Sequence, residues 1–292
     1  MVVSSCFIFH TSKFLLIGVF DSGVGGLSVW REIRRCIPDA PLIYLADQAH
    51  VPYGPRPAHE IIQLTEACVH WLIERGCQVI VIACNTATAA ALPHLRSTFP
   101  HIPFVGMEPA VKPAVALTRS GVIGVLATHT TVKSARFASL VQRYARDVRV
   151  IERACPTWVA LVERGEIDHS QTLSQVAGDL QPVIAAGADT LVLGCTHFPF
   201  LSTPIQQVLA DWHVAHPQAP VTSVVDPAPA VAQQCLRQWQ AQSHAHNHLP
   251  NATLELHTTG DPHTFAQIAL HLLGIPNNEQ HVMVINRVRV AL

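Results

Sequence analysis

The sequence predicts an α/β protein of two pseudo-symmetric lobes, each a mainly parallel sheet flanked by helices, with the functional site in the cleft between them. Short apolar runs alternate with longer runs of helical periodicity along the 292 residues. The runs of strand length are apolar at nearly every position, as strands are when helices cover both faces of a parallel sheet. Each half of the chain also contains one such run that ends in a cysteine, Cys84 or Cys195.

The first half contains four predicted strands and two predicted helices. Apolar, β-branched segments of strand length lie at 14–20, 41–47, 77–84 and 102–108. Apolar residues three and four positions apart predict amphipathic helices at 27–37 and 59–76. Between the second strand and the second helix, the segment HVPYGPRP is rich in Pro and Gly and predicts a rigid loop.

The second half repeats this arrangement. Strands are expected at 121–128, 148–155, 189–195 and 221–228, with helical segments between them. IGVFDSG at 17–23 corresponds to IGVLATH at 123–129, which indicates two related lobes. We assign 14–108 plus 221–285 to lobe 1 and 109–220 to lobe 2. Residues 1–13 are expected to form a flexible extension.

The composition is typical of a compact globular protein. Hydrophobic residues make up 49% and charged residues 13% of the chain, and the formal net charge is -1. This balance predicts no nucleic-acid partner and no anionic membrane surface. No apolar stretch approaches the ~20 residues of a membrane-spanning helix.

The eight cysteines predict a reduced, cytoplasmic protein, because they form no C-x-x-C pair and no zinc-finger spacing. Cys36, Cys68, Cys77 and Cys235 lie on apolar faces and are expected to be packing residues. Cys155, directly before Pro156, stays ambiguous.

Cys84 and Cys195 differ from the other cysteines in their position. Each follows a predicted buried strand and precedes polar residues that can open a helix, where oriented N–H groups favour a thiolate. Parallel sheets bind ligands at the carboxyl ends of their strands, so both thiols are expected to face one cleft. Paired groups of one chemical type suit a reaction that moves a proton from one face of a carbon to the other.

Other polar residues stand at equivalent strand ends. His197 can act as a charge partner for Cys195 or face solvent near the start of a helix. Asp21 precedes a Gly-rich turn and can orient a thiol or bind an ammonium group. That turn lacks both the GxGxxG pattern and the Lys of a phosphate loop, so no nucleotide is expected. The N–H groups of Tyr53–Gly54 can bind a carboxylate.

Six segments, in their order and spacing, resemble those of glutamate racemase, of the cofactor-independent aspartate/glutamate racemase superfamily. They are DSGVGG (21–26), PYG (52–54), ACNTAT (83–88), ATHTTV (127–132), ACPTWVALVERG (154–165) and LGCTHFP (193–199). The resemblance extends from about residue 14 to 270. ACNTAT and GCTHFP are specific to the superfamily, and DSGVGG with PYG favours its glutamate branch.

The resemblance implies an isomerase that interconverts L- and D-glutamate by two-base proton transfer. Cys84 would take the α-proton from D-glutamate and Cys195 from L-glutamate. Asp21 would assist Cys84, and His197 would assist Cys195. Asp47 and Glu163 match further acidic positions of the family's site. The implied substrate-binding residues are Asp21, Ser22, Tyr53, Gly54, Asn85, Thr86, Thr128, Thr196 and His197.

The resemblance also implies a biological setting. The substrate is glutamate, no cofactor and no metal are expected, and D-glutamate would supply peptidoglycan synthesis in the bacterial cytoplasm, hence the cell wall and cell shape. Members of the family are often homodimers, and some respond to a peptidoglycan precursor; the resemblance leaves both open for this chain.

Three features lie outside the family pattern or the predicted site. Thr130 stands where the family usually has Gly, and a β-branched residue is poor at positive φ, so a different local turn is expected. Residues 1–13 have no counterpart in the family. The polar stretch 241–251 predicts a surface loop whose alternating histidines, at 244–248, are not expected to bind a metal.

Alternative functions remain at this point. A racemase of another acidic amino acid, such as aspartate, or of a hydantoin would share the two thiols, although Asp21–Ser22 and Tyr53–Gly54 favour glutamate. A noncatalytic α/β binding protein would have buried, unreactive cysteines. A cysteine hydrolase is disfavoured because neither cysteine shows a Cys/His/Asn protease pattern.

Overall fold

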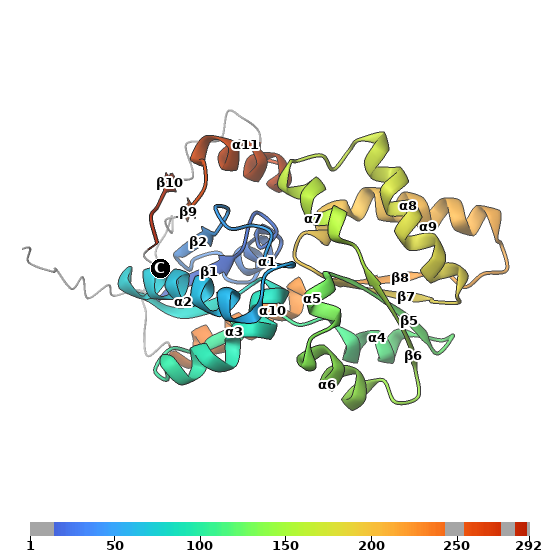
Figure 1. Cartoon of the computed structure of the whole chain (residues 1–292), viewed down its shortest axis with the longest axis horizontal. Helices are drawn as coiled ribbons and strands as arrows, with labels where there is room; N and C mark the ends of the chain where they lie inside the picture. Colours follow the sequence, from blue (N-terminus) through green and yellow to red (C-terminus); the bar gives the residue numbers. More distant parts are fainter. Residues whose placement is uncertain (1–14, 243–253, 276–283, 291–292) are drawn as a thin grey trace, which may run out of the picture.

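The computed structural model describes residues 15–242, 254–275 and 284–290, which form two parallel sheets side by side (Figure 1). The strands are β1 (Leu16–Asp21), β2 (Leu42–Ala46), β3 (Cys77–Ile82), β4 (Phe104–Gly106), β5 (Val122–Ala127), β6 (Arg149–Ala154), β7 (Thr190–Gly194), β8 (Ser223–Val225), β9 (Leu254–Thr258) and β10 (Val284–Arg287). Every strand pairing in this part of the chain is parallel. The predicted α/β class is therefore confirmed.

Helices connect the strands along most of the chain. They are α1 (Leu27–Cys36), α2 (Ala58–Glu74), α3 (Asn85–Thr98), α4 (Val111–Leu117), α5 (His129–Val132), α6 (Ala135–Tyr144), α7 (Pro156–Glu163), α8 (Ser170–Ala185), the 3₁₀ helix η1 (Phe198–Leu201), α9 (Ser202–Ala215), α10 (Ala228–Gln242) and α11 (Pro262–Leu273). The predicted helices at 27–37 and 59–76 correspond to α1 and α2.

The two sheets share one strand order. Sheet A runs β10-β9-β2-β1-β3-β4, and sheet B runs β6-β5-β7-β8. The first four strands of the chain thus have the same order, β2-β1-β3-β4, as the next four. This repeat confirms the predicted pseudo-symmetry, and β9 and β10 extend sheet A beyond β2.

All eight predicted strands form, but β9 and β10 were not predicted. In β9 (LELHT), polar side chains follow each leucine, so the strand is not apolar at every position as its neighbours are. Its pairing with the buried strand β2 fixes it in sheet A. Residues 1–13 and the histidines at 244–248 lie outside the described residues.

One strand does not follow the predicted lobe boundary. The prediction assigned 221–285 to lobe 1, whereas β8 pairs with β7 in sheet B. The chain adds this short strand to the edge of sheet B and then crosses back as α10, which packs on α1. The sequence of these three partly exposed residues does not indicate which sheet they join. The pairing is determined by the strand edge that lies next to them in the folded protein. The remaining lobe boundaries stay a prediction.

Helices cover both faces of each sheet. On β3, the side chains of Val79 and Val81 face α1 and α10, whereas Ile80 and Ile82 face α2 and α3. In sheet B, α4 and α6 pack on one face and α8 and α9 on the other. This burial on both sides explains why the strands are almost continuously apolar.

One apolar core joins the lobes. The buried cluster that packs α1 and α10 onto sheet A continues through α7 and η1 to the α8–α9 face of sheet B. Within the lobe-2 part of this core, the rings of Trp158 and Phe198 meet edge to face with centroids 4.8 Å apart. The carboxyl ends of the two sheets face each other across this shared core (Figure 1).

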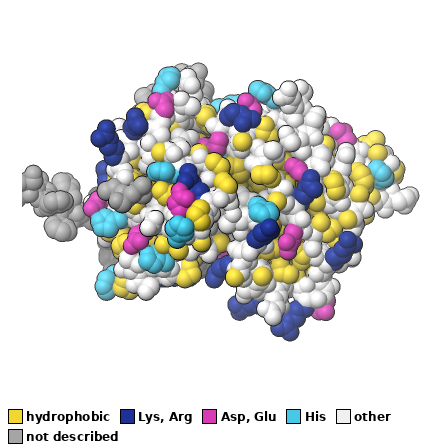
Figure 2. All heavy atoms as spheres, viewed as in Figure 1, with side chains coloured by type: hydrophobic (Ala, Val, Ile, Leu, Met, Phe, Trp, Pro, Cys, Tyr) yellow, Lys and Arg dark blue, Asp and Glu magenta, His cyan; other side chains and the backbone are white. Residues whose placement is uncertain are grey.

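The surface carries no dominant charge on the face seen in Figure 2, where basic and acidic side chains are interspersed over both lobes. Within the described ranges, no helix is both long enough and apolar enough to cross a bilayer.

Asp189, just before β7, anchors the turn after α4. Its carboxylate accepts hydrogen bonds from Thr118 Oγ1 at 2.6 Å and from the N–H groups of Arg119 and Ser120, each at 2.7 Å. Burial opposes the charged form, but these hydrogen bonds prevail and lower the pKa of Asp189 from its ordinary value.

We predict that Asp189→Ala lowers the free energy of unfolding at pH 7 by about 2 kcal/mol, because it removes a charged acceptor from four donors, the fourth being Thr190 Oγ1 at 3.1 Å. The group's pKa is lowered on folding, so its stabilisation is present at neutral pH and declines as the pH falls below about 4. Urea unfolding across pH measures this difference. Asp211→Ala, at an exposed residue, is the control and should change stability by less than about 0.5 kcal/mol. A pH-independent difference for Asp189→Ala would contradict the assignment.

Candidate functional site

A cavity of about 280 Å³ lies between the carboxyl ends of the two sheets. Its walls come from both lobes and include both candidate cysteines. The lining residues are Ser22, Pro52, Tyr53, Gly54, Pro55, Cys84, Asn85, Thr86, Thr128, His129, Pro156, Val159, Cys195, Thr196 and His197. Most of the residues predicted from the sequence thus meet in one cavity.

Cys84 lies between β3 and α3, as the sequence predicts. It is the N-cap residue of α3, and its Sγ accepts a hydrogen bond from Ala87 N at 3.4 Å. Ser22 Oγ lies 3.6 Å from the same sulfur. Burial, with the nearby charge of Asp21, raises the pKa of Cys84 to about 12, against the lowering effect of these hydrogen bonds. Cys84 is therefore a thiol at neutral pH in the unliganded protein.

Cys195 occupies the equivalent position after β7 but has different surroundings. Its Sγ lies 3.6 Å from Nδ1 of His197. No α-helix begins directly after it, in contrast to the prediction, since a turn and the 3₁₀ helix η1 come first. Pro199 has no N–H to bond the Cys195 carbonyl in an α-helical pattern, which explains the tighter turn.

His197 bridges Cys195 and an acidic residue. Its Nε2 lies 2.6 Å from Oε1 of Glu163, the last residue of α7. Burial lowers the pKa of His197, but hydrogen bonding to Cys195 and Glu163 outweighs burial and raises it well above the ordinary value. Glu163 thus orients the imidazole toward the cavity and the Cys195 thiol. Since His197 is buried, the alternative that it faces solvent is wrong.

Asp21 stands behind the cavity wall. Its Oδ1 accepts from Gly23 N at 2.8 Å and its Oδ2 from Thr196 Oγ1 at 3.0 Å. Burial raises the pKa of Asp21, partly offset by His197. Asp21 is not among the cavity-lining residues, and the neighbouring Ser22 is the residue that contacts Cys84. Its expected contact with substrate stays a prediction.

The glycines of the turn after β1 make room for the polar side chains of lobe 2. A Cβ on Gly23 would lie 1.8 Å from Glu163 Oε1, and one on Gly25 would lie 2.3 Å from His197 Nδ1. Val24 N, between them, donates to Glu163 Oε1 at 2.8 Å. The turn is therefore glycine-rich because the backbone itself packs against these two side chains.

Asp47 holds the loop that carries Tyr53. Its carboxylate accepts from Tyr53 Oη at 2.7 Å and from Thr259 Oγ1 at 2.7 Å, and it pairs with His50 Nδ1 at 2.9 Å. Asp47 is buried and does not line the cavity. In this geometry it fixes the position of Tyr53, which does line the cavity.

Hydroxyl groups link the lobes at the other side of the cavity. Thr86 Oγ1 of α3 lies 3.1 Å from Thr128 Oγ1, the N-cap of α5. Thr130 lies inside α5 and its hydroxyl donates to the carbonyl of Gly54 across the cleft. Thr130 is helical, a conformation that β-branched residues tolerate, so the backbone needs no positive φ at this residue. That this turn differs from the family's stays a prediction.

Asn85 is a polar group without a partner. Its side chain is 3% exposed and lines the cavity, and both its Oδ1 and its Nδ2 lack hydrogen-bond partners. A buried amide in this state costs free energy unless a bound molecule supplies a donor and an acceptor. Asn85 therefore indicates a ligand with both kinds of group.

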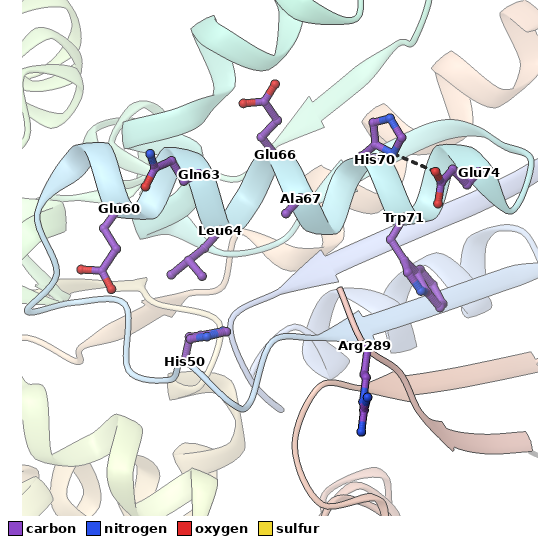
Figure 3. A pocket seen from close by; sticks show the side chains of 10 residues that line it. All are labelled: His50, Glu60, Gln63, Leu64, Glu66, Ala67, His70, Trp71, Glu74 and Arg289. Atoms are coloured by element: carbon purple, nitrogen blue, oxygen red, sulfur yellow. Dashed lines mark ion pairs between the residues drawn. The ribbon is translucent and has the colours of Figure 1, made fainter. Parts of the chain in front are cut away.

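A larger groove of about 770 Å³ runs along α2, with Arg289 opposite Trp71 (Figure 3). Its carboxylates already have basic partners: Glu66 lies 2.9 Å from His94, Glu74 lies 3.2 Å from His70, and Glu60 pairs with Arg56. None of its lining residues is a cysteine. The groove is thus unsuited to the thiol chemistry predicted from the sequence.

The other cysteines pack as predicted. Cys68, Cys77 and Cys235 are buried, Cys36 is half-buried, and the seven described cysteines carry free thiols. The ambiguous Cys155 is also buried, directly before α7. Within the described ranges, no cluster of three or more His, Cys, Asp or Glu residues is arranged to hold a metal ion.

Several residues around the site were not predicted. His129 and Val159 lie inside the segments ATHTTV and ACPTWVALVERG, so those segments were the available signal. Gln48 and Thr258, which lie behind Glu163, have no such signal because they reach the site only through the packing of β2 and β9.

The chain is similar to known racemases over most of its length. Residues 17–235 match the Asp/Glu/Hydantoin racemase family. A glutamate racemase of Roseiflexus sp. is 45% identical over 273 residues, which cover 92% of this chain and 97% of that protein.

Solved structures agree with the sequence match. The crystal structure of glutamate racemase isoform RacE1 from Bacillus anthracis superposes with a TM-score of 0.80 at 31% identity, covering 96% of this chain and 98% of that one. Glutamate racemase of Escherichia coli, solved with L-glutamate and the activator UDP-MurNAc-Ala, gives 0.78 at 31% identity, covering 96% of this chain and 100% of that one. The chain belongs to the Asp/Glu/Hydantoin racemase family and, within it, to the glutamate racemases.

Proposed function

We propose that this protein interconverts L- and D-glutamate by moving the α-proton between Cys84 and Cys195. The observation that carries the proposal is that two thiols, at equivalent strand ends of two related sheets, line one cavity. Each lobe supplies one thiol, so a substrate bound between them is approached from two sides. Proton transfer in either direction then needs one group that accepts and one that donates.

The surroundings of the two thiols indicate which one begins as proton donor and which as proton acceptor. Cys84 is protonated at neutral pH in the unliganded protein and is ready to donate. Cys195 lies beside His197, and a cationic imidazole at that position stabilises a thiolate by charge. L-glutamate then loses its α-proton to the Cys195 sulfur, Cys84 gives its proton to the opposite face, and D-glutamate results. The reverse reaction begins with a thiolate at Cys84 and a thiol at Cys195.

The cavity supports the developing negative charge. Removing the α-proton leaves carbanion character next to the substrate carboxylate, which hydrogen-bond donors stabilise best where water is excluded. The unpartnered amide of Asn85 lies at this space, and α3 begins there with Asn85 and Thr86, both of which line the cavity. We assign substrate binding to these groups together with Ser22, Tyr53, Gly54, Thr86, Thr128, Thr196 and His197. Asp21, Asp47 and Glu163 position them from behind.

The biological role follows from the product. D-glutamate is a building block of bacterial peptidoglycan, so we propose that the enzyme works in wall synthesis in the cytoplasm, where the free cysteines stay reduced. The Escherichia coli relative was solved with the activator UDP-MurNAc-Ala, and we propose a peptidoglycan precursor of this class as an effector here. A homodimer stays a prediction from the family resemblance.

The direct test of the proposed function is α-hydrogen exchange of each glutamate enantiomer in D₂O without added cofactor. The wild type should racemise glutamate and place deuterium in the product. Cys84→Ser and Cys195→Ser should each lower the rate by about 10²–10⁴-fold, the range for loss of one acid–base group. Cys36→Ser, at a half-buried cysteine outside the cavity, should keep the wild-type rate. Activity on aspartate alone would overturn the substrate, and no exchange at all would favour a binding protein.

The state of Cys84 predicts its reactivity. Since its pKa is about 12, its thiolate fraction keeps rising through the alkaline range. Iodoacetamide labelling at Cys84, followed by mass spectrometry, should therefore accelerate about ten-fold per pH unit up to pH 9.5 without a plateau. Labelling of a reduced, unfolded sample should level off near the ordinary thiol pKa of about 8.5. A labelling rate that levels off near pH 8.5 in the folded protein would contradict the raised pKa of Cys84.

Gly25 predicts a steric test of His197. Gly25→Ala places a Cβ 2.3 Å from His197 Nδ1 and 2.6 Å from Thr196 Oγ1, so the imidazole must shift from its position beside Cys195. We expect kcat to fall by about 10²-fold, as for a misplacement of about 1 Å. Gly178→Ala is the control, because its Cβ meets no atom within 4 Å and the residue is exposed on α8. Equal activity of the two variants would show that the close packing at Gly25 is not needed.

A further inference from the structure

The carboxylate of Glu163 has donors on both oxygens. Oε1 faces His197 Nε2 at 2.6 Å and accepts from Val24 N at 2.8 Å. Oε2 accepts from Nε2 of Gln48 at 3.1 Å. Gln48 lies in lobe 1, just after β2, whereas Glu163 ends α7 in lobe 2. The amide therefore holds the far oxygen of the carboxylate across the junction between the lobes.

Thr258 sets the orientation of the Gln48 amide. Gly260 N donates to Thr258 Oγ1 at 3.0 Å, and an N–H can only donate. The Thr258 hydroxyl donates its own hydrogen to Oε1 of Gln48, 3.0 Å away, because the Glu163 carboxylate on the other side of the amide can only accept and so faces Nε2. With its oxygen occupied in this way, the amide presents its NH₂ group to Glu163.

The fold brings these residues together at adjacent strand ends. β2 and β9 are neighbouring parallel strands, and Ala46 is in register with Thr258. Thr258 is fully buried and Gln48 is half-buried. A Cβ on Gly260 would lie 2.9 Å from Cβ of Gln48, so the chain also packs closely around the amide. The chain of contacts runs from the carboxyl end of β9 to the imidazole next to Cys195.

We infer that Gln48, oriented by Thr258, is a positioning residue for proton transfer at Cys195. It fixes the Glu163 carboxylate against His197, and the carboxylate in turn fixes the imidazole beside the sulfur. Neither Gln48 nor Thr258 lines the cavity, so neither touches the substrate. This inference rests on the proposed function and adds to it two residues that act on the chemical step through others.

The test compares kcat and KM for glutamate racemisation in Gln48→Leu and wild type. Leu keeps a similar volume but removes the donor to Glu163. We expect kcat to fall about ten-fold, the effect of losing one hydrogen bond to a charged group, while KM stays within about two-fold. Gln207→Leu is the matched control, since Gln207 donates to Asp211 at 2.8 Å on the exposed face of α9. It should leave both constants unchanged.

Substitutions of Thr258 provide a second test. Thr258→Val removes the hydroxyl and should lower kcat in the same way, whereas Thr258→Ser keeps the hydroxyl and should restore most of it. Because Thr258 acts through Gln48, the double variant Gln48→Leu/Thr258→Val should be no slower than Gln48→Leu alone. A role in general stability would instead give additive losses.

The possible outcomes are distinct. An active wild type with an unchanged kcat in Gln48→Leu would overturn the inference and leave the proposed function intact. A rise in KM that matches the loss of kcat, or additive losses in the double variant, would also overturn it in favour of a structural role. An inactive wild type would instead refute the proposed function itself. A selective fall in kcat with rescue by Thr258→Ser supports the inference.

Discussion

The ion pair between Glu163 and His197 is the interaction on which the organisation of this site depends. Both residues belong to the second half of the chain, yet the carboxylate also accepts hydrogen bonds from Val24 N and Gln48 of the first half. One buried group thus sets the imidazole beside Cys195 and fastens the two lobes at the same point. Because the carboxylate is enclosed, any change in the approach of the lobes alters the geometry at the thiol.

This constraint explains features that otherwise look unrelated. Gly23 and Gly25 have no side chain because Glu163 and His197 occupy the space where a Cβ would lie. The polar groups behind the cavity, Asp21 and Asp47, are bonded to backbone and hydroxyl donors and hold the lining residues in place. The cavity itself keeps one unpartnered amide, Asn85, for a bound molecule.

The two thiols are equivalent in topology but not in chemistry. Cys84 caps a long α-helix and has Ser22 as its side-chain neighbour, whereas Cys195 precedes a 3₁₀ turn and has His197. The repeated strand order places them alike, and the residues that follow each strand make them different. The equivalent positions suit a racemase, because the two faces of the substrate must meet one proton donor and one proton acceptor in each turnover, with the roles exchanged in the reverse reaction.

Much of this could be predicted from local sequence patterns. Apolar runs of strand length predicted the first eight strands, since burial on both faces leaves a strong signal, and the polar steps after Cys84 and Cys195 marked the two strand ends. The alternating β9 and the side on which β8 pairs were not predicted, because a short, partly exposed strand takes its place from a neighbouring edge.

The sequence by itself determined the fold class, the pairing of two cysteines and the resemblance to racemases, since these depend on residue types at fixed spacings along the chain. Only the tertiary structure decided that Asp21 stands behind the cavity, that Thr130 is helical, and that Gln48 and Thr258 reach Glu163. These contacts join residues far apart in the chain. They arise from the close packing of strand ends, and such packing leaves no local pattern in the sequence.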